Sequence, residues 1–236
     1  MSEKVIWITG ASTGIGREIC MEFSKAGNIV VATARRKSRL VNLVSEIKFA
    51  GREASAFVCN VASERSVQIT AKRIREKYGR IDCLINNAGV TVFKSFTDTK
   101  VYEFDYVMSI NLRGAFLCMK TVLPQMVKNK KGHIINLLSV AANTVYENSS
   151  VYSASKAGLL AMTNSIREET RRYNIKISNI LPEATDTAMW DSKTRQKHKN
   201  RMLSPAEVAK ITVEVFNQPK KVLIEDVVLR PIKGDL

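Results

Sequence analysis

The chain has 236 residues, of which 45% are hydrophobic and 25% are charged. This composition is typical of a globular protein with a sizeable core, and it excludes an intrinsically disordered chain. The formal net charge of +15 favours anionic partners through long-range attraction. Because the basic residues are spread along the whole chain, with one dense run at 193–201, we interpret them as a solvated surface and expect no nucleic-acid partner.

The cysteines and the N-terminal segment exclude several further classes of protein. The four cysteines, at positions 20, 59, 83 and 118, are widely spaced, and none forms a CxxC pair or lies near a histidine. Neither a metal site nor a disulfide framework is therefore expected. The N-terminal segment MSEKVIWITGAS lacks the features of a signal peptide, and no apolar run is long enough to cross a bilayer. We expect a soluble cytoplasmic protein that does not bind membranes.

Short apolar runs rich in β-branched residues alternate with longer segments of helical periodicity along the chain. Strands are predicted at 4–9, 28–33, 54–58, 82–85, 133–138, 176–181 and near Val227. Helices are predicted at 14–26, 38–50, 63–78, about 99–129, 151–173 and 205–216. The alternation predicts a doubly wound parallel sheet between two helical layers, a three-layer α/β/α Rossmann fold. We expect 1–236 to form a single domain.

Local residues explain several of these boundaries. Gly27 and Asn28 tolerate a left-handed backbone and so favour the end of the first helix. Ser204 before Pro205, with an acid at position 207, is typical of a helix N-terminus. The polar segment 183–203 interrupts the alternation, and we interpret it as a surface lid.

A glycine-rich loop joins the first predicted strand to the first predicted helix. It reads Thr9-Gly10-Ala11-Ser12-Thr13-Gly14-Ile15-Gly16. Glycines let the backbone turn tightly and approach a pyrophosphate, whose charge is met by the N–H groups of a helix N-terminus. The GxxxGxG spacing is a weak signal by itself, but its place between a strand and a helix favours dinucleotide binding.

The end of the second predicted strand indicates which dinucleotide would bind. An acid near this point binds the ribose 2′-hydroxyl of NAD, whereas arginine accepts the 2′-phosphate of NADP. Here Ala34 is followed by Arg35 and Arg36. Because guanidinium groups suit phosphate in shape and charge, these residues predict NADP(H).

A tyrosine and a lysine one turn apart open the predicted helix 151–173. Tyr152 and Lys156 share one helix face, so the ammonium group can lie near the phenol. A nearby positive charge favours phenolate and would lower the tyrosine pKa from about 10. Such a tyrosine can act as general acid in a reduction and as general base in the reverse reaction. Taken alone, the YxxxK pattern is common by chance and usually means an exposed helix face.

The motifs together resemble those of the short-chain dehydrogenase/reductase family, over essentially the whole chain. In order they are TGASTGIG from Thr9, NNAG from Asn86, Asn111, Ser139, YSASK from Tyr152, and Pro182 with Thr187. The resemblance implies an NADPH-dependent oxidoreductase that reduces a ketone or aldehyde to an alcohol, reversibly. The 3-oxoacyl carrier-protein reductases are among the enzymes that the chain resembles.

The resemblance implies four catalytic residues. Tyr152 would donate its proton to the carbonyl oxygen as the hydride arrives. Ser139 would hydrogen-bond and orient that oxygen. Lys156 would lower the Tyr152 pKa and hold the nicotinamide ribose, and Asn111 would hold a water that resupplies protons. Taken singly, Asn111 could instead satisfy backbone groups at a helix kink, and Ser139 could cap its strand.

The cofactor residues are implied by the same resemblance. Asn86, Asn87, Ala88 and Gly89 would close the fourth strand around the adenosine side, and Thr187 would bond the nicotinamide carboxamide. The full predicted set is Gly10, Ser12, Thr13, Gly14, Ile15, Gly16, Arg35, Arg36, Asn60, Val61, Asn87, Ala88, Gly89, Tyr152, Lys156, Pro182, Thr185 and Thr187.

Three positions depart from the family pattern. Asn60 stands where an aspartate usually bonds the adenine, and its side-chain oxygen can still accept. Leu138 replaces a frequent serine before Ser139. Glu183 follows Pro182 where glycine is usual, which puts the local backbone geometry and the preferred substrate charge in question.

The substrate depends on the segments after Ser139 and at 183–203. Tyr146, Met189 and Trp190 are candidate pocket walls, although such residues are as often plain packing. The basic run 193–201 would suit an acidic carrier protein or a phosphorylated substrate. A 3-oxoacyl thioester, a pterin, a sugar and a small ketone all remain candidates.

Two other function classes compete with this interpretation. An NAD-linked alcohol dehydrogenase is disfavoured by Ala34 and the two arginines that follow it. A non-catalytic NADP-binding regulator would have no need for the proton relay.

We also expect a homo-oligomer, a dimer or tetramer, as is common in the family. The apolar residues Phe116, Leu117, Leu159 and Leu160 are expected to remain partly uncovered in one subunit.

Overall fold

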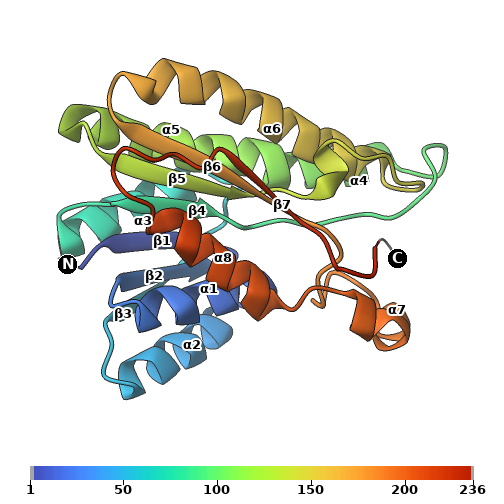
Figure 1. Ribbon diagram of the computed structural model, residues 1–236, viewed down its shortest axis with the longest axis horizontal. Coiled ribbons are helices and arrows are strands. Elements are labelled where there is room, and N and C mark those ends of the chain that lie inside the picture. Colours follow the sequence, from blue (N-terminus) through green and yellow to red (C-terminus); the bar gives the residue numbers. More distant parts are fainter. Residues whose placement is uncertain (1–2, 235–236) are drawn as a thin grey trace.

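The computed structural model describes residues 3–234, and the seven strands within this range form one parallel sheet (Figure 1). The strand order is β3-β2-β1-β4-β5-β6-β7. The strands are β1 Val5–Thr9, β2 Ile29–Ala34, β3 Ala54–Val58, β4 Cys83–Asn86, β5 Gly132–Leu137, β6 Ile175–Pro182 and β7 Asp226–Leu229. The predicted doubly wound α/β fold is confirmed.

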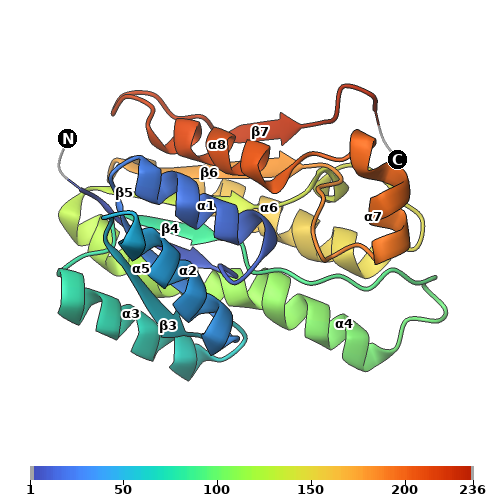
Figure 2. The ribbon, with the colours of Figure 1, turned by 90° about the horizontal axis from the view of Figure 1, so that it is seen from below.

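Helices cover both faces of the sheet. They are α1 Gly14–Lys25, α2 Lys37–Phe49, α3 Glu64–Tyr78, α4 Val101–Met108, α5 Ala115–Asn129, α6 Ser150–Arg171, α7 Ser192–His198 and α8 Pro205–Phe216. One face packs against α1, α2 and α8, and the other against α3, α5 and α6 (Figures 1 and 2). The sheet therefore has an apolar core on each side, which explains why its central strands are buried along their length and rich in apolar residues.

The predicted strand bounds agree with the structure to within one residue, whereas two helical regions differ. The predicted helix 99–129 is interrupted by a π-helical segment, Ser109–Gly114, between α4 and α5. The predicted lid 183–203 contains α7, whose N-cap is Asp191. The Asp191 carboxylate accepts hydrogen bonds from the N–H groups of Lys193 and Thr194. The sequence analysis did not predict this short helix, because none of its residues is buried and its sequence therefore has no apolar periodicity.

The predicted boundary signals are present in the structure. Gly27 has a φ of +74°, in the left-handed region that glycine adopts without strain. Ser204 and Glu207 form a reciprocal capping box at the start of α8, with Pro205 as its first residue.

The expectation about uncovered apolar residues was wrong for two of the four. Leu117 and Leu159 are buried in the core of a single subunit, packed under α5 and α6. Phe116 is 41% exposed and Leu160 is half-buried. The exposed apolar side chains gather instead on α4, which carries Val101, Tyr102, Phe104 and Tyr106.

Within residues 3–234, no helix combines the length and the apolar character that a membrane span requires.

Three amide side chains and one carboxylate form a hydrogen-bonded row, here called the amide row, across four strands of the sheet. Asn86, Asn136, Asn179 and Asp226 are in register on β4, β5, β6 and β7. Asn86 Nδ2 donates to Asn136 Oδ1 at 2.9 Å, Asn136 Nδ2 to Asn179 Oδ1 at 3.2 Å, and Asn179 Nδ2 to Asp226 Oδ1 at 2.8 Å. Because the three asparagines are buried, each amide depends on its neighbour for hydrogen bonds. The amide row fixes the register of β4, β5, β6 and β7, and so helps to place the residues that follow the carboxyl ends of these strands.

Replacing Asn136 by leucine should therefore destabilise the fold. The change keeps the side-chain volume but leaves Asn86 Nδ2 without its acceptor and Asn179 Oδ1 without its donor, which should cost about 3 kcal/mol of unfolding free energy. Urea denaturation measures the effect, and Asn42→Leu on the exposed face of α2 is the matched control. A midpoint for Asn136→Leu equal to that of Asn42→Leu would contradict a structural role for the row.

Candidate active site

The carboxyl ends of the strands open into a cleft of about 1020 Å³. The cleft extends from the topological switch point between β1 and β4. There the connections after the two strands lead to opposite faces of the sheet, and folds of this type bind ligands at that point. The predicted residues that line it are Gly10, Ser12, Thr13, Gly14, Ile15, Arg35, Arg36, Asn60, Val61, Asn87, Ala88, Gly89, Ser139, Tyr152, Lys156, Pro182, Thr185 and Thr187. The cleft has the size of a dinucleotide pocket.

The glycine loop forms one end of the cleft. Gly10 and Gly14 have φ values of +65° and +58°, so the turn between β1 and α1 needs residues without a side chain. Gly16 does not line the cleft. A Cβ atom at Gly16 would collide with the Asn87 side chain and with the Gly10 carbonyl, so this glycine permits α1 to pack against the end of β4.

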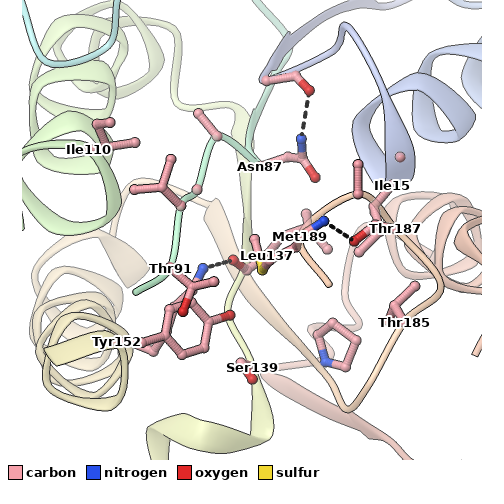
Figure 3. A pocket seen from close by; sticks show the side chains of 18 of the residues that line it. Ile15, Asn87, Thr91, Ile110, Leu137, Ser139, Tyr152, Thr185, Thr187 and Met189 are labelled. Carbon is pink, nitrogen blue, oxygen red and sulfur yellow. Dashed lines mark hydrogen bonds between the residues drawn. The ribbon is translucent and has the colours of Figure 1, made fainter. Parts of the chain in front are cut away.

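Asn87 ties the glycine loop to β4. Its Nδ2 donates to the carbonyls of Thr9 and Gly10 at 2.9 and 3.2 Å, and its N–H donates to Thr9 Oγ1. The loop and the segment after β4 therefore hold each other in place on the two sides of the switch point (Figure 3).

Two exposed guanidinium groups lie where the second strand ends. Arg36 Nη2 donates to Ser12 Oγ at 2.8 Å and to Thr13 Oγ1 at 3.1 Å, which folds the side chain over the glycine loop. Arg35 also lines the cleft and is exposed. Both groups are available to an anion at this end of the cleft, with no acid among the cleft residues of β2.

Asn60 and Val61 follow β3 at the same end. Asn60 is exposed, and its Oδ1 accepts from the Ala62 N–H at 3.2 Å, so part of its accepting capacity is used within its own turn. Val61 is buried against Gly114 of the π-helical segment.

Tyr152 lies at the opposite end of the cleft, on the first turns of α6, and Ser139 lies two residues after the end of β5 (Figure 3). Burial raises the pKa of Tyr152 to about 12, and a hydrogen bond with Ser139 acts in the other direction. The phenol therefore keeps its proton at neutral pH, which is the form that a proton donor needs. Ser139 Oγ also accepts from the Ala141 N–H at 3.2 Å, which orients the hydroxyl.

Lys156 is buried one turn after Tyr152. Its Nζ donates to the carbonyl of Leu137 at 2.8 Å and lies 5.7 Å from the centre of the Tyr152 ring. Burial lowers the Lys156 pKa to about 8. The expected lowering of the Tyr152 pKa is not found, because the loss of hydration outweighs the other influences on the phenol.

Asn111 lies in the π-helical segment beneath the cleft and does not line it. Its side chain accepts from the Val90 N–H and donates to the Val90 carbonyl, both at 2.9 Å, and it also donates to Ser155 Oγ. A Cβ atom at Gly89 would lie 3.6 Å from Asn111 Oδ1 and 3.7 Å from Lys156 Nζ, so these groups meet at Gly89. Satisfying backbone groups at a helix irregularity is thus one role that Asn111 does perform.

The segment after β6 forms the remaining wall. Thr185 Oγ1 donates to the Glu183 carbonyl at 2.9 Å, and Thr187 Oγ1 accepts from the Met189 N–H at 3.3 Å (Figure 3). Pro182 is buried at the end of β6. Thr187 also lies against the glycine loop, 3.2 Å from where a Gly14 Cβ would be, so the wall reaches across to the first turn.

Phe93 and Thr91 are among the cleft residues that the sequence analysis did not name. The Phe93 ring stacks on that of Trp190 with centroids 5.2 Å apart and planes at 20°, and it lies 6.5 Å from the Tyr152 ring. Thr91 Oγ1 is buried in the cleft and has no hydrogen-bond partner within residues 3–234 (Figure 3). The position of both residues directly after the NNAG segment was the available signal.

These features fit a bound NADP(H) molecule. The cleft has the volume, the glycine loop lets a backbone approach, two arginines face the adenosine end, and Thr91 offers an unpaired hydroxyl. The donor set does not suggest a metal, since no three His, Cys, Asp or Glu side chains gather anywhere in the described range.

Known proteins resemble this chain over nearly its whole length. A sepiapterin reductase of Chlorobaculum tepidum is 32% identical over 239 residues, which cover 98% of each chain. An alcohol dehydrogenase of the archaeon Thermococcus sibiricus, complexed with 5-hydroxy-NADP, superposes with a TM-score of 0.92 at 25% identity, covering 100% of this chain and 99% of the other. A metagenomic short-chain oxidoreductase in complex with NADP superposes with a TM-score of 0.86 at 30% identity, covering 97% of this chain and 96% of the other.

A family model described as short chain dehydrogenase matches residues 4–198, which include the glycine loop and the residues around Tyr152. Together with relatives that match from end to end, this result shows that the chain belongs to the short-chain dehydrogenase family.

Proposed function

We propose that this protein is an NADPH-dependent carbonyl reductase. The observation that carries the proposal is the buried Tyr152 phenol, which remains protonated and lies between Ser139 and Lys156 at the far end of a dinucleotide-sized cleft. The whole of 1–236 would act as one oxidoreductase domain, and we propose that it acts in the cytoplasm.

Each residue of the proposed catalytic set has a separate role. When bound, NADPH supplies the hydride that reduces the carbonyl carbon. Tyr152 donates its proton to the carbonyl oxygen, and Ser139 hydrogen-bonds that oxygen and stabilises its developing negative charge. Lys156 holds the nicotinamide ribose and supports the phenol through its charge. Asn111 holds a water that returns the proton from solvent.

The cofactor would lie along the residues that line the cleft. The pyrophosphate fits the glycine loop from Gly10 to Ile15 at the N-terminus of α1, and the 2′-phosphate fits Arg35 and Arg36. Asn60 and Val61 would hold the adenine, and Asn87, Ala88 and Gly89 its ribose side. Pro182, Thr185 and Thr187 would contact the nicotinamide.

The substrate that the walls favour is a carbonyl on a planar ring. Phe93 and Trp190 provide stacked aromatic faces close to Tyr152, and Tyr146 and Met189 extend this apolar wall. The similarity to a sepiapterin reductase, a pterin enzyme by name, supports the same class. A 3-oxoacyl thioester on an acidic carrier rests on the basic run 193–201 alone, so we place it second.

The active form is proposed to be a homo-oligomer. The exposed apolar side chains of α4, Val101, Tyr102, Phe104 and Tyr106, together with Phe116 at the start of α5, provide a surface that a second subunit could cover.

Arg36→Ala should weaken the preference for NADPH over NADH. A hydrogen bond to a charged group contributes about 1.5–3 kcal/mol, so the ratio of kcat/KM values for the two cofactors should fall about tenfold or more. The measurement is initial-rate kinetics with both cofactors. Arg39→Ala, a nearby arginine on α2 that does not line the cleft, is the control. Equal use of both cofactors by the wild type would reject the proposed NADPH preference.

Tyr152→Phe should nearly abolish reduction while NADPH affinity is retained. Phenylalanine keeps the ring but removes the proton donor, and general acid catalysis contributes about 10²–10⁴-fold, so the loss should appear in kcat. Turnover and NADPH fluorescence titration separate the two effects, and Tyr102→Phe on the exposed face of α4 is the matched control. Near wild-type turnover by Tyr152→Phe would show that another group donates the proton.

Trp190→Ala should raise KM for a ring carbonyl more than for a small acyclic ketone. Aromatic stacking contributes about 0.5–1.5 kcal/mol, so the KM for sepiapterin should rise roughly threefold to tenfold. A panel of sepiapterin, a 3-oxoacyl thioester and a small ketone tests the substrate class, with Phe49→Ala on α2 as control. If only the thioester is reduced by the wild type, the ring-carbonyl proposal fails.

A further inference from the structure

A carboxylate is buried beside the cleft at the end of β6. Glu183 follows Pro182, lines the cleft, and has a side chain only 4% exposed. Its backbone is fixed on both sides, since its N–H donates to the Leu229 carbonyl and its own carbonyl accepts from Thr185. A buried carboxylate is costly unless a positive group compensates it, so its partner is part of the site.

A positive partner of Glu183 comes from the segment after β7. Arg230 follows β7, and its Nη1 lies 3.4 Å from Glu183 Oε2. Its Nη2 donates to Thr144 Oγ1 at 3.3 Å. One guanidinium group therefore joins three segments that are distant in sequence, because its planar donors can bond two partners at once.

The joined segments are those that carry the proposed chemistry. Thr144 lies in the segment between Ser139 and Tyr152. Its backbone N–H donates to the Val140 carbonyl. Glu183 opens the segment whose Thr185 and Thr187 form the opposite wall of the cleft. The bridge thus spans from the substrate side to the nicotinamide side.

We propose that Arg230 is a positioning residue, which holds the segment between Ser139 and Tyr152 against the end of β6 through Thr144 and Glu183. The chain segment after β7 is then part of the reductase site, although it carries no group that reacts. The kinetic consequence rests on the proposed function, whereas the structural bridge does not.

Hydrogen exchange tests the bridge without any substrate. Arg230→Met in the full-length protein should speed backbone exchange in 140–149 and 184–190, by about tenfold, because local opening becomes easier. Exchange in β1 should stay unchanged. Arg230→Lys should restore part of the protection, and Lys233→Met, an exposed lysine in the same segment, should behave as wild type. Unchanged exchange in 140–149 of Arg230→Met overturns the proposal.

Kinetics then test the role in reduction. Arg230→Met should lower kcat about tenfold or more, since small misplacements of reacting groups are costly, while KM and NADPH affinity stay within about twofold. The double variant Glu183→Gln/Arg230→Met should recover part of the loss, because it also removes the buried negative charge that Arg230 compensates. A kcat for Arg230→Met equal to that of Lys233→Met refutes the positioning role.

The two proposals fail in different ways. A wild type that reduces no carbonyl of the panel rejects the proposed function, and hydrogen exchange still decides whether Arg230 holds 140–149 in place.

Discussion

A buried ammonium group is tolerated only where fixed polar partners replace its lost water, and Lys156 finds such a partner in the carbonyl of Leu137. Leu137 is the last residue of β5, so the bond fixes α6 against the end of that strand. Tyr152 lies one turn earlier on the same helix, and Ser139 lies two residues after Leu137. This contact therefore helps to set the spacing of the proposed proton donor and the proposed orienting hydroxyl, together with the hydrogen bond between Tyr152 and Ser139.

The same burial decides the protonation states at the site. Removing Tyr152 from water raises its pKa to about 12, and removing Lys156 lowers its pKa to about 8, because each loses hydration of its charged form. The sequence pattern suggested the opposite direction for the tyrosine, since spacing on a helix says nothing about burial. The protein alone thus favours a neutral phenol, which suits donation of a proton rather than its removal.

Much of the fold could be predicted because its causes are local. Seven apolar β-branched runs identified the strands, and the Ser204 cap marked the start of α8. What could not be predicted depends on distant contacts. The π-helical segment accompanies the bonds of Asn111 to the backbone of Val90, and the Phe93–Trp190 stack joins two loops. The role of Gly16 in helix packing, rather than in lining the cleft, also required the neighbouring Asn87.

The edge strand β7 is held by charge as well as by apolar packing, since Val227 and Leu229 pack against the core while Asp226 and Val228 are exposed. Arg167, which is 6% exposed, pairs with Asp226 at 3.0 Å and with Glu225 at 3.6 Å, and Arg230 pairs with Glu183 just beyond the strand. Charged side chains also discourage an edge strand from pairing with another chain. Because Asp226 ends the amide row and Glu183 borders the cleft, ion pairs at the rim of the sheet support the cleft wall that follows β6. Salt should therefore weaken this wall more than the apolar core beneath it, since partly exposed pairs are screened and buried apolar contacts are not.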